Sequence, residues 1–375
     1  MQPYAHRIHI LQQQLQPSQA FLLTQAADFT YFTGFRPVTH NEREGFLLVT
    51  IGSAELFAAA FSPLPVYIEE SVVAHSPLEY LKVTRSTHLA RVATSIAKAN
   101  VKELIVDDTG IFASELKLLQ SHVASTQNPQ ELTFPFRHLD RQMLWKQRSI
   151  KDHTELEHIR KAAEIAKIAI HQTLTSLHPG QTEKDVAHAF DMRLYDLGAD
   201  GPAFPTIVAF GNHATLPHHQ PGDTKLINET PVLIDCGAMV EAYNSDLTRT
   251  IWFGEKPSAE YLKIKSIVDR AYNIGLEQLQ LRALKSKSLT AGEVDRAVRT
   301  FITDSGYGDE YIHTTGHGIG IDVHEPPSVY QTNSQIIEDN IVITIEPGIY
   351  VPGKLGYRYE NTILVTSKAP QELTK

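Results

Sequence analysis

The chain has 375 residues, of which 42% are hydrophobic and 21% are charged, and its formal net charge is −9. This length suits two domains that each bury a core, and the composition is typical of a soluble globular protein. The acidic balance excludes nucleic acid and membrane as expected partners, because phosphate backbones and anionic lipids repel it. Cys236 is the single cysteine, and no apolar leader or bilayer-length apolar run occurs, so we expect a cytoplasmic protein.

Short strand and helix patterns alternate in residues 1–135, which predicts a small α/β domain. Strands are expected at Ala20–Thr24, Phe46–Thr50, Glu55–Ala60 and Leu104–Val106, and helices near Thr87–Lys98 and Phe112–Gln120. This part holds no cluster of catalytic residue types, so packing or oligomerisation is its expected role. Polar, irregular chain is expected over Ser121–Arg148, and we place a linker at 136–150.

Residues 151–375 are predicted to form a second, mixed domain. A long helix is expected from Asp152 or Thr154 to a stop at Pro179-Gly180, because apolar residues recur there at helical spacing. Further helices are expected at Glu183–Leu197, Ser258–Arg282 and Ala291–Ser305, with β-rich stretches from Asp200 to Phe253 and from His313 onward. Two helix pairs, each followed by strands, indicate an internal duplication.

Two aspartates follow strand-like segments in this second domain. Asp235 ends an apolar run, and Asp246 lies in Asn244-Ser245-Asp246-Leu247-Thr248-Arg249-Thr250. A hairpin with its turn near Val240-Glu241 would place the two aspartates opposite each other. Carboxylates that close repel unless they are protonated or bridged by cations, so they are candidates for metal ligation, beside the alternative of an acidic turn.

Histidines and glycines gather further along the chain. His313, His317 and His324 lie within twelve positions, interleaved with three glycines. Glycine lets the backbone pass close to a ligand, and imidazole is a good ligand for divalent transition metals. His218 follows a proline in a separate loop, where it can face a substrate or simply lie at the surface.

Two glutamates complete the pattern at the ends of strand-like segments. Glu346 follows an isoleucine-rich segment, and Glu360 shares a strand face with Arg358, a spacing that a surface ion pair also produces. Four carboxylates and one imidazole balance the charge of two divalent cations and exceed what one cation needs. The sequence therefore predicts a dinuclear cage made of Asp235, Asp246, His317, Glu346 and Glu360.

In order and spacing, these motifs resemble those of the pita-bread metallopeptidases, the superfamily of prolidase, Xaa-Pro aminopeptidase and methionine aminopeptidase. The matching segments are Ile234–Gly237, Asn244–Thr250, His317 with His324-Glu325-Pro326, Ile345–Gly348 and Arg358–Asn361. Asp28–Phe35 is similar to the leading domain of the proline-specific branch, which methionine aminopeptidases lack. The resemblance implies an α+β protein with a creatinase-like N-terminal α/β domain over 1–135 and a catalytic pita-bread domain over 151–375.

The resemblance also implies a role for each member of the cage. Asp246 and Glu360 would bridge two metal ions, Asp235 would chelate one of them near the substrate amine, and His317 and Glu346 would complete the other. A hydroxide bridging the metals would attack the peptide bond, and Glu346 would carry its proton to the leaving nitrogen. The carboxylate-rich cage favours Mn²⁺, with Co²⁺ or Zn²⁺ as alternatives.

Around the cage, the resemblance implies residues that meet the substrate. His218 and His324 would contact it and stabilise the tetrahedral intermediate, His313 and Tyr350 would line the proline side, and Arg358 would orient a carboxylate. The implied substrates are short peptides with proline at the second position. A homodimer is expected from the family analogy alone.

Two positions depart from the family pattern. Tyr359 stands where an aliphatic residue is usual, and Ser328 stands where some strict dipeptidases carry a basic group. The second departure favours an Xaa-Pro aminopeptidase over the alternative, an Xaa-Pro dipeptidase (prolidase). A metal-free creatinase-like amidinohydrolase and a non-catalytic binding protein on the same fold are remoter alternatives, because both lose cage ligands and this chain has ligand types at all five positions.

Overall fold

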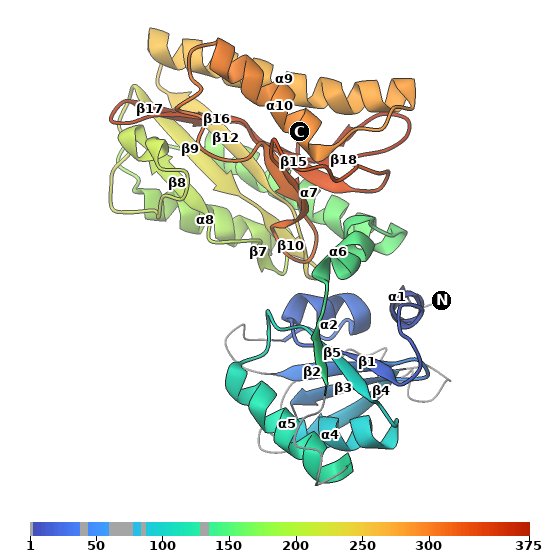
Figure 1. Ribbon diagram of the computed structural model, residues 1–375. Coiled ribbons are helices and arrows are strands. Elements are labelled where there is room, and N and C mark those ends of the chain that lie inside the picture. The colour runs from blue at the N-terminus through green and yellow to red at the C-terminus, as the bar shows by residue number, and fades with distance from the viewer. Residues whose placement is uncertain (1–2, 38–43, 60–77, 84–87, 128–134) are drawn as a thin grey trace. The chain divides into compact units, whose positions relative to one another are not determined.

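The computed structural model describes residues 3–37, 44–59, 78–83, 88–127 and 135–375. By its internal contacts the chain divides into two compact units, Met1–Leu144 and Trp145–Lys375 (Figure 1). Each unit has its own strands and its own buried apolar clusters.

The first unit is built on a mixed sheet of six described strands, in the order β4-β3-β2-β1-β5-β6. Its strands are β1 (Gln19–Leu23), β2 (Gly45–Thr50), β3 (Ala54–Ala59), β4 (Leu78–Val83), β5 (Glu103–Val106) and β6 (Phe136–His138). Its helices are α1 (Pro3–Gln12), α2 (Ala26–Thr33), α4 (His88–Lys98) and α5 (Ala113–Gln127). Figure 1 shows α4 and α5 on one face of this sheet and α1 and α2 on the other.

The predicted strands and helices of this unit are confirmed to within a few residues, except in its last part. Irregular chain was expected from Ser121, but α5 continues to Gln127 because Leu119 and Val123, one helical turn apart, are both buried. The expected linker at 136–150 holds β6, which pairs with β5, and α6 (Arg141–Ser149). Its polar composition concealed a helix that buries Leu144 completely.

The second unit places its strands between two pairs of helices, as Figure 1 shows. The helices are α7 (His153–Thr175), α8 (Glu183–Asp196), α9 (Ala259–Lys285) and α10 (Ala291–Asp304). Asp152, Thr182, Ser258 and Thr290 cap them, each side chain accepting a backbone N–H three residues on. The predicted α+β class and its two helix-strand blocks are confirmed.

The strands of this unit form several small sheets. In chain order they are β7 (Gly201–Pro202), β8 (Ile207–Phe210), β9 (Thr230–Cys236), β10 (Ala238–Val240), β11 (Tyr243–Asn244), β12 (Leu247–Phe253), β13 (Gly316–Gly318), β14 (Glu325–Val329), β15 (Val342–Ile345), β16 (Gly348–Val351), β17 (Leu355–Arg358), β18 (Asn361–Leu364) and β19 (Gln371–Glu372). The sheet orders are β12-β9-β8, β14-β13-β15-β18-β19, β11-β10-β7 and β16-β17. One apolar core joins α7 and α8 to β8–β10, and another joins α9 and α10 to β14, β15 and β18.

Gly237 allows the chain to bend directly after β9, where the backbone comes close to the segment that leads into β12. A Cβ on Gly237 would lie 1.9 Å from the carbonyl oxygen of Ser245, so only glycine fits this close backbone approach. The chain then turns at Glu241 and Ala242, which both have positive φ, next to the turn expected at Val240-Glu241.

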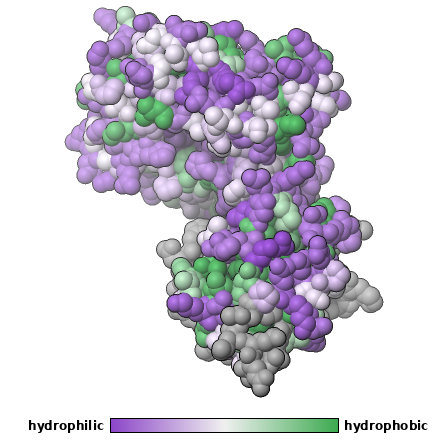
Figure 2. Space-filling view, viewed as in Figure 1, coloured by the Kyte–Doolittle hydropathy of each residue, from purple (hydrophilic) through white to green (hydrophobic). Residues whose placement is uncertain are grey.

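The surface of the second unit is mainly polar on the face seen in Figure 2, with small, separate hydrophobic patches. Among the helices of the described residues, none is long and apolar enough to cross a membrane.

Candidate metal centre

The five residues of the predicted cage lie on strands or directly beside them and line one cavity of about 830 Å³ in the second unit. Asp235 lies on β9, His317 on β13, and Asp246 directly before β12. Glu346 directly follows β15, and Glu360 directly precedes β18. The structure therefore places all five side chains along the wall of a single cavity, although the residues span more than 120 positions of the sequence.

The register of β9 and β12 corrects one expectation. Asp235 pairs with Thr248, so the two aspartates do not lie directly opposite each other as predicted. Asp246 lies two residues before Thr248 and therefore on the same face, because side chains alternate along a strand. The aspartates are diagonal neighbours, which still directs both toward the cavity.

His317 presents one ring nitrogen to the carboxylates of the cage. Its Nδ1 lies 3.0 Å from the carbonyl oxygen of Gly318, which can only accept, so Nδ1 carries the proton. Its Nε2 lies 3.6 Å from Asp246 Oδ2 and 3.6 Å from Glu346 Oε1. Burial lowers the pKa of His317 to about 4, which keeps the ring neutral and its Nε2 lone pair available to a metal ion.

Three carboxylate oxygens of the cage are buried without a hydrogen-bond partner in the part of the chain that the structure describes. They are Asp235 Oδ1, Asp246 Oδ1 and Glu360 Oε1. Burial, and then the neighbouring carboxylates, raise the pKa of Asp246 and Glu346 well above the usual range and that of Glu360 to about 8. Cations would stabilise buried carboxylate oxygens of this kind, so the donor set fits divalent metal ions.

A buried arginine links the cage to the histidines around it. Arg358 pairs with Asp235, donates from Nε to Thr248 Oγ1 at 3.0 Å, and Thr248 in turn donates to Glu360 Oε2 at 2.7 Å. Arg358 also donates to the Tyr350 hydroxyl at 2.6 Å. The alternative of an exposed Arg358–Glu360 ion pair is therefore wrong, because both side chains are buried and Thr248 stands between them.

Tyr350 lies behind the cavity wall rather than in its lining, in contrast to the expected place on the proline side. Its hydroxyl is 2.9 Å from His313 Nε2, while His313 Nδ1 is 2.7 Å from the Thr314 carbonyl oxygen. Nδ1 therefore donates, and Nε2 accepts from Tyr350. Burial and the charge of Arg358 lower the pKa of His313 to about 3, so a neutral His313 faces the cavity.

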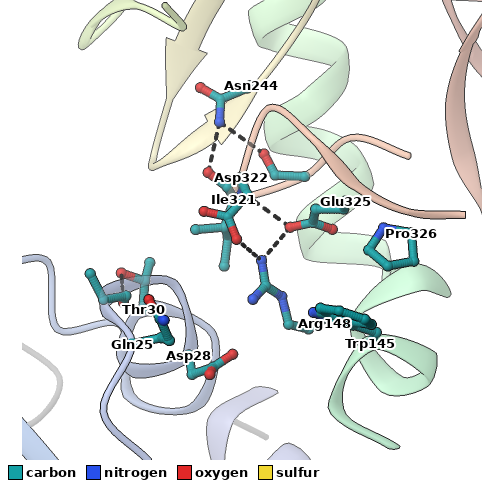
Figure 3. A network of polar contacts seen from close by, with 12 residues as sticks. Gln25, Asp28, Thr30, Trp145, Arg148, Asn244, Ile321, Asp322, Glu325 and Pro326 are labelled. Carbon is teal, nitrogen blue, oxygen red and sulfur yellow. Dashed lines mark hydrogen bonds and ion pairs between the residues drawn. The ribbon is translucent and has the colours of Figure 1, made fainter. Parts of the chain in front are cut away.

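A polar network holds the segment that carries His324, as Figure 3 shows. The Glu325 carboxylate pairs with Arg148 and Lys151 and accepts the backbone N–H of Asp322 at 3.1 Å. Burial alone would raise the pKa of Glu325, but the two cations hold it at about 2. Asn244 donates to the Ile321 carbonyl at 2.7 Å (Figure 3), which ties the same segment to β11.

The rest of the cavity wall is largely apolar. It includes Trp145, Phe204, Pro205, Ile207, Pro217, Val323 and Pro326. The predicted substrate residues His218, His313 and His324 line the same cavity. Among the lining residues that the structure describes, Arg358 is the only lysine or arginine, and its guanidinium is occupied by Asp235, Thr248 and Tyr350.

A model of metallopeptidase family M24 matches residues 157–367, which is more than half of the chain. The chain belongs to metallopeptidase family M24. As a member of this family it is a metallo-exopeptidase with the pita-bread fold, and both expectations are confirmed.

Solved structures similar to this M24 peptidase come from the proline-specific branch. An Xaa-Pro dipeptidase from Bacillus anthracis is 28% identical, with a TM-score of 0.85 over 99% of this chain and 98% of that one. A prolidase from Thermococcus sibiricus is 30% identical, with a TM-score of 0.84 over 100% and 98%. An X-Pro aminopeptidase from Thermotoga maritima is 27% identical, with a TM-score of 0.80 over 97% of each chain. The resemblance to the proline-specific branch is thus confirmed.

Sequence reasoning missed three residues that support the site of this peptidase. Thr248 was one threonine in a strand motif, and Glu325 was only the neighbour of His324. Glu183, at the start of α8, is completely buried and contacts His213 and His219, on either side of His218. A carboxylate whose partners lie about 30 positions away leaves no local signal in a single sequence.

Proposed function

We propose that this M24 peptidase is an Xaa-Pro dipeptidase that holds two divalent metal ions, with Mn²⁺ as the favoured ion. The observation that carries the proposal is the group of buried carboxylate oxygens without partners, on Asp235, Asp246 and Glu360. The names of the similar dipeptidase and prolidase structures support the substrate class. They also favour a dipeptidase over the aminopeptidase that Ser328 suggested.

In the proposed site, Asp235, Asp246, His317, Glu346 and Glu360 would hold the metal ions. When bound, the ions would lower the pKa of a water molecule and polarise the scissile carbonyl. Arg358 orients Asp235 directly and Glu360 through Thr248, so that each carboxylate keeps an oxygen for the ions.

Glu346 is the proposed proton carrier. Its Oε2 lies 4.0 Å from His313 Nδ1, and its Oε1 lies 3.6 Å from His317 Nε2. The carboxylate therefore lies between a residue of the predicted cage and a predicted substrate-binding residue. It takes a proton from the attacking water at a carboxylate oxygen and delivers it to the proline nitrogen as the C–N bond breaks. That nitrogen carries no hydrogen in the substrate, so the leaving amine depends on this delivery.

The substrate is positioned by the histidines and the apolar wall. His218 and His324 approach the carbonyl oxygen and stabilise the negative charge that develops on it. His313, held by Tyr350, faces the proline ring, which packs against the apolar side of the cavity.

A second candidate is an Xaa-Pro aminopeptidase that accepts longer peptides. Two features favour it. Ser328 lines the cavity where a basic residue would suit a strict dipeptidase, and Arg358, which is the only lysine or arginine among the described lining residues, already pairs with Asp235. Among the lining residues that the structure describes, no uncommitted lysine or arginine is available for the carboxylate that a dipeptide would bring into the cavity.

The two candidates separate in one assay. The protein is stripped with a chelator, reloaded with Mn²⁺, Co²⁺ or Zn²⁺, and given an Xaa-Pro dipeptide or an Xaa-Pro-Xaa tripeptide. We expect the reloaded protein to cleave the dipeptide at least tenfold faster than the tripeptide. Preference for the tripeptide would move the proposal to the aminopeptidase, and cleavage of neither peptide with any metal would defeat both. We also propose the homodimer that the family analogy implies. Size-exclusion chromatography with light scattering should give twice the mass of one chain, and the mass of a single chain would refute the homodimer.

A further inference from the structure

We propose that Glu183 is a positioning residue that holds the loop carrying His218 in the place that catalysis requires. This loop, residues 210–222, is called the histidine loop below, and the inference rests on the proposed role of His218. Glu183 is the first residue of α8 and has no solvent exposure. It lies outside the cavity lining, so it can act only through the loop.

Each oxygen of the Glu183 carboxylate accepts two hydrogen bonds from the histidine loop. Oε1 accepts the backbone N–H of Phe210 at 2.8 Å and the ring of His213 at 2.8 Å. Oε2 accepts the ring of His219 at 2.9 Å and the backbone N–H of Gly222 at 2.9 Å. The contacts lie at both ends of the loop and at two points within it, so one buried anion fastens the whole segment.

The chemistry of these contacts requires an anion with four acceptor positions. A carboxylate only accepts, so His213 donates from Nδ1 and His219 from Nε2. The hydrogen bonds lower the pKa of Glu183, although burial opposes them, and the carboxylate stays ionised. Its place on the first turn of α8 adds the favourable end of the helix dipole.

The loop is stiff enough to carry this anchoring to His218. Inside it, Leu216 N–H donates to the His213 carbonyl at 3.0 Å, and His219 N–H donates to the Leu216 carbonyl at 3.1 Å. His218 thus lies between two fastened histidines, and its own side chain lines the cavity. Displacement of a catalytic group by about 1 Å can cost a hundredfold in rate.

A metal site is the competing interpretation of these three residues, because their ligand atoms lie within 4.8 Å of one another. Every oxygen of Glu183 is already satisfied, and two of its four partners are backbone N–H groups that cannot ligate a cation. A metal ion would require both imidazoles to adopt the other tautomer and would repel those two N–H groups. The geometry therefore favours an anchor.

The anchor is tested by a double-mutant cycle with His218. Glu183→Gln replaces one acceptor oxygen by an NH₂ group that opposes its two donors. It should lower kcat/KM for an Xaa-Pro dipeptide roughly ten- to hundredfold in the native background and less than about threefold in the His218→Ala background. Equal losses in the two backgrounds would overturn the proposal, because a purely structural defect does not depend on His218.

Lys184→Ala is the matched control. Lys184 is the next residue of α8 and pairs with Asp223 just beyond the loop, but this ion pair is exposed. We expect less than a twofold change, since exposed pairs contribute little. His213→Ala, which removes a single contact at a half-exposed side chain, keeps the test available if Glu183→Gln does not fold, and should give a smaller loss that again depends on His218.

Hydrogen exchange tests the anchor without any activity. In Glu183→Gln, amides of residues 210–222 should exchange on the order of tenfold faster while those of α7 stay unchanged. Unchanged exchange in the loop would contradict the anchor. If the native protein cleaves no Xaa-Pro peptide, the proposed function fails and this measurement still decides the anchor. Loss of one bound metal ion in Glu183→Gln would overturn the anchor in favour of a metal site.

Discussion

The second unit contains two clusters of carboxylates and imidazoles that look alike by distance and differ in chemistry. In Asp246–His317–Glu360 and in Glu183–His213–His219, the ligand atoms lie within 4.8 Å of one another. The first cluster leaves buried carboxylate oxygens without partners, and its carboxyl pKa values are raised. In the second, four N–H donors satisfy one carboxylate, whose pKa is lowered.

The difference teaches that proximity alone does not identify a metal site. A buried carboxylate must be stabilised by hydrogen bonds or by a cation. A cluster whose carboxylate oxygens have no hydrogen bonds therefore requires a cation. We therefore propose that the first cluster holds metal ions, whereas the hydrogen bonds within the protein already satisfy the carboxylate of the second.

The largest effect is expected for Glu346→Gln, which removes the proton carrier of the cage. Turnover of an Xaa-Pro dipeptide should fall by on the order of a thousandfold or more, with an unchanged circular dichroism spectrum. The exposed Glu338→Gln is the control and should keep native turnover. A Glu346→Gln protein within tenfold of native turnover would refute the proton-carrier role.

The next largest effect is expected in the metal-dependent stability of the protein, which should depend on the first cluster and not on the second. At a free metal concentration of a hundred times Kd, each bound ion adds about 2.7 kcal/mol, or roughly 5–10 °C in Tm for a domain of this size. Calorimetry with and without chelator should show this shift in native protein and in Glu183→Gln, and a much smaller one in Asp246→Asn. A full shift in Asp246→Asn would place the ions elsewhere.

The pH dependence of stability in the chelated protein should have opposite signs for the two clusters. Glu360 has a pKa raised to about 8, so its contribution is present below about pH 4.5 and is lost as the pH rises toward 8. Glu183 has a lowered pKa, so its contribution is present above about pH 4.5 and is lost as the pH falls below that value.

This contrast is read from Tm against pH for native protein, Glu360→Gln and Glu183→Gln. At alkaline pH, the Tm of Glu360→Gln should rise relative to that of the native protein. At neutral pH, the Tm of Glu183→Gln should lie furthest below that of the native protein. If both variants deviate in the same direction across the range, the contrast between the clusters is wrong.

The smallest effect is expected for Tyr350→Phe, which removes only the hydroxyl between Arg358 and His313. The hydroxyl accepts from Arg358 and donates to His313, and the loss of these two hydrogen bonds of about 1 kcal/mol each corresponds to roughly thirtyfold at most in kcat/KM, without loss of metal. Steady-state kinetics on the dipeptide measures it. An effect equal to that of Glu346→Gln would mean that the hydroxyl takes part in the reaction itself.

Much of the second unit could be predicted from its sequence because local signals are strong there. The cage residues lie on strands or directly beside them, and His317 and Glu346 are next to glycine or proline, so pattern and residue type coincide. The helix caps Asp152 and Thr182 are equally local. Charge counting then grouped residues that the sequence alone could not place side by side.

The missed features depend on contacts between distant parts of the chain. Glu183 is an ordinary residue for the first turn of a helix, and only the folded structure shows its burial against residues 27 to 39 positions away. Tyr350 carries an aromatic ring suited to a proline subsite, yet Arg358 and His313 hold it behind the wall. Helix α6 has too few apolar residues to reveal its period.

The central contrast is tested most directly by the metal content of Mn²⁺-loaded protein, measured by inductively coupled plasma mass spectrometry after removal of free metal. We expect two ions per chain in native protein and in Glu183→Gln, and fewer than two in Asp246→Asn. Two ions retained by Asp246→Asn, together with a loss from Glu183→Gln, would contradict it.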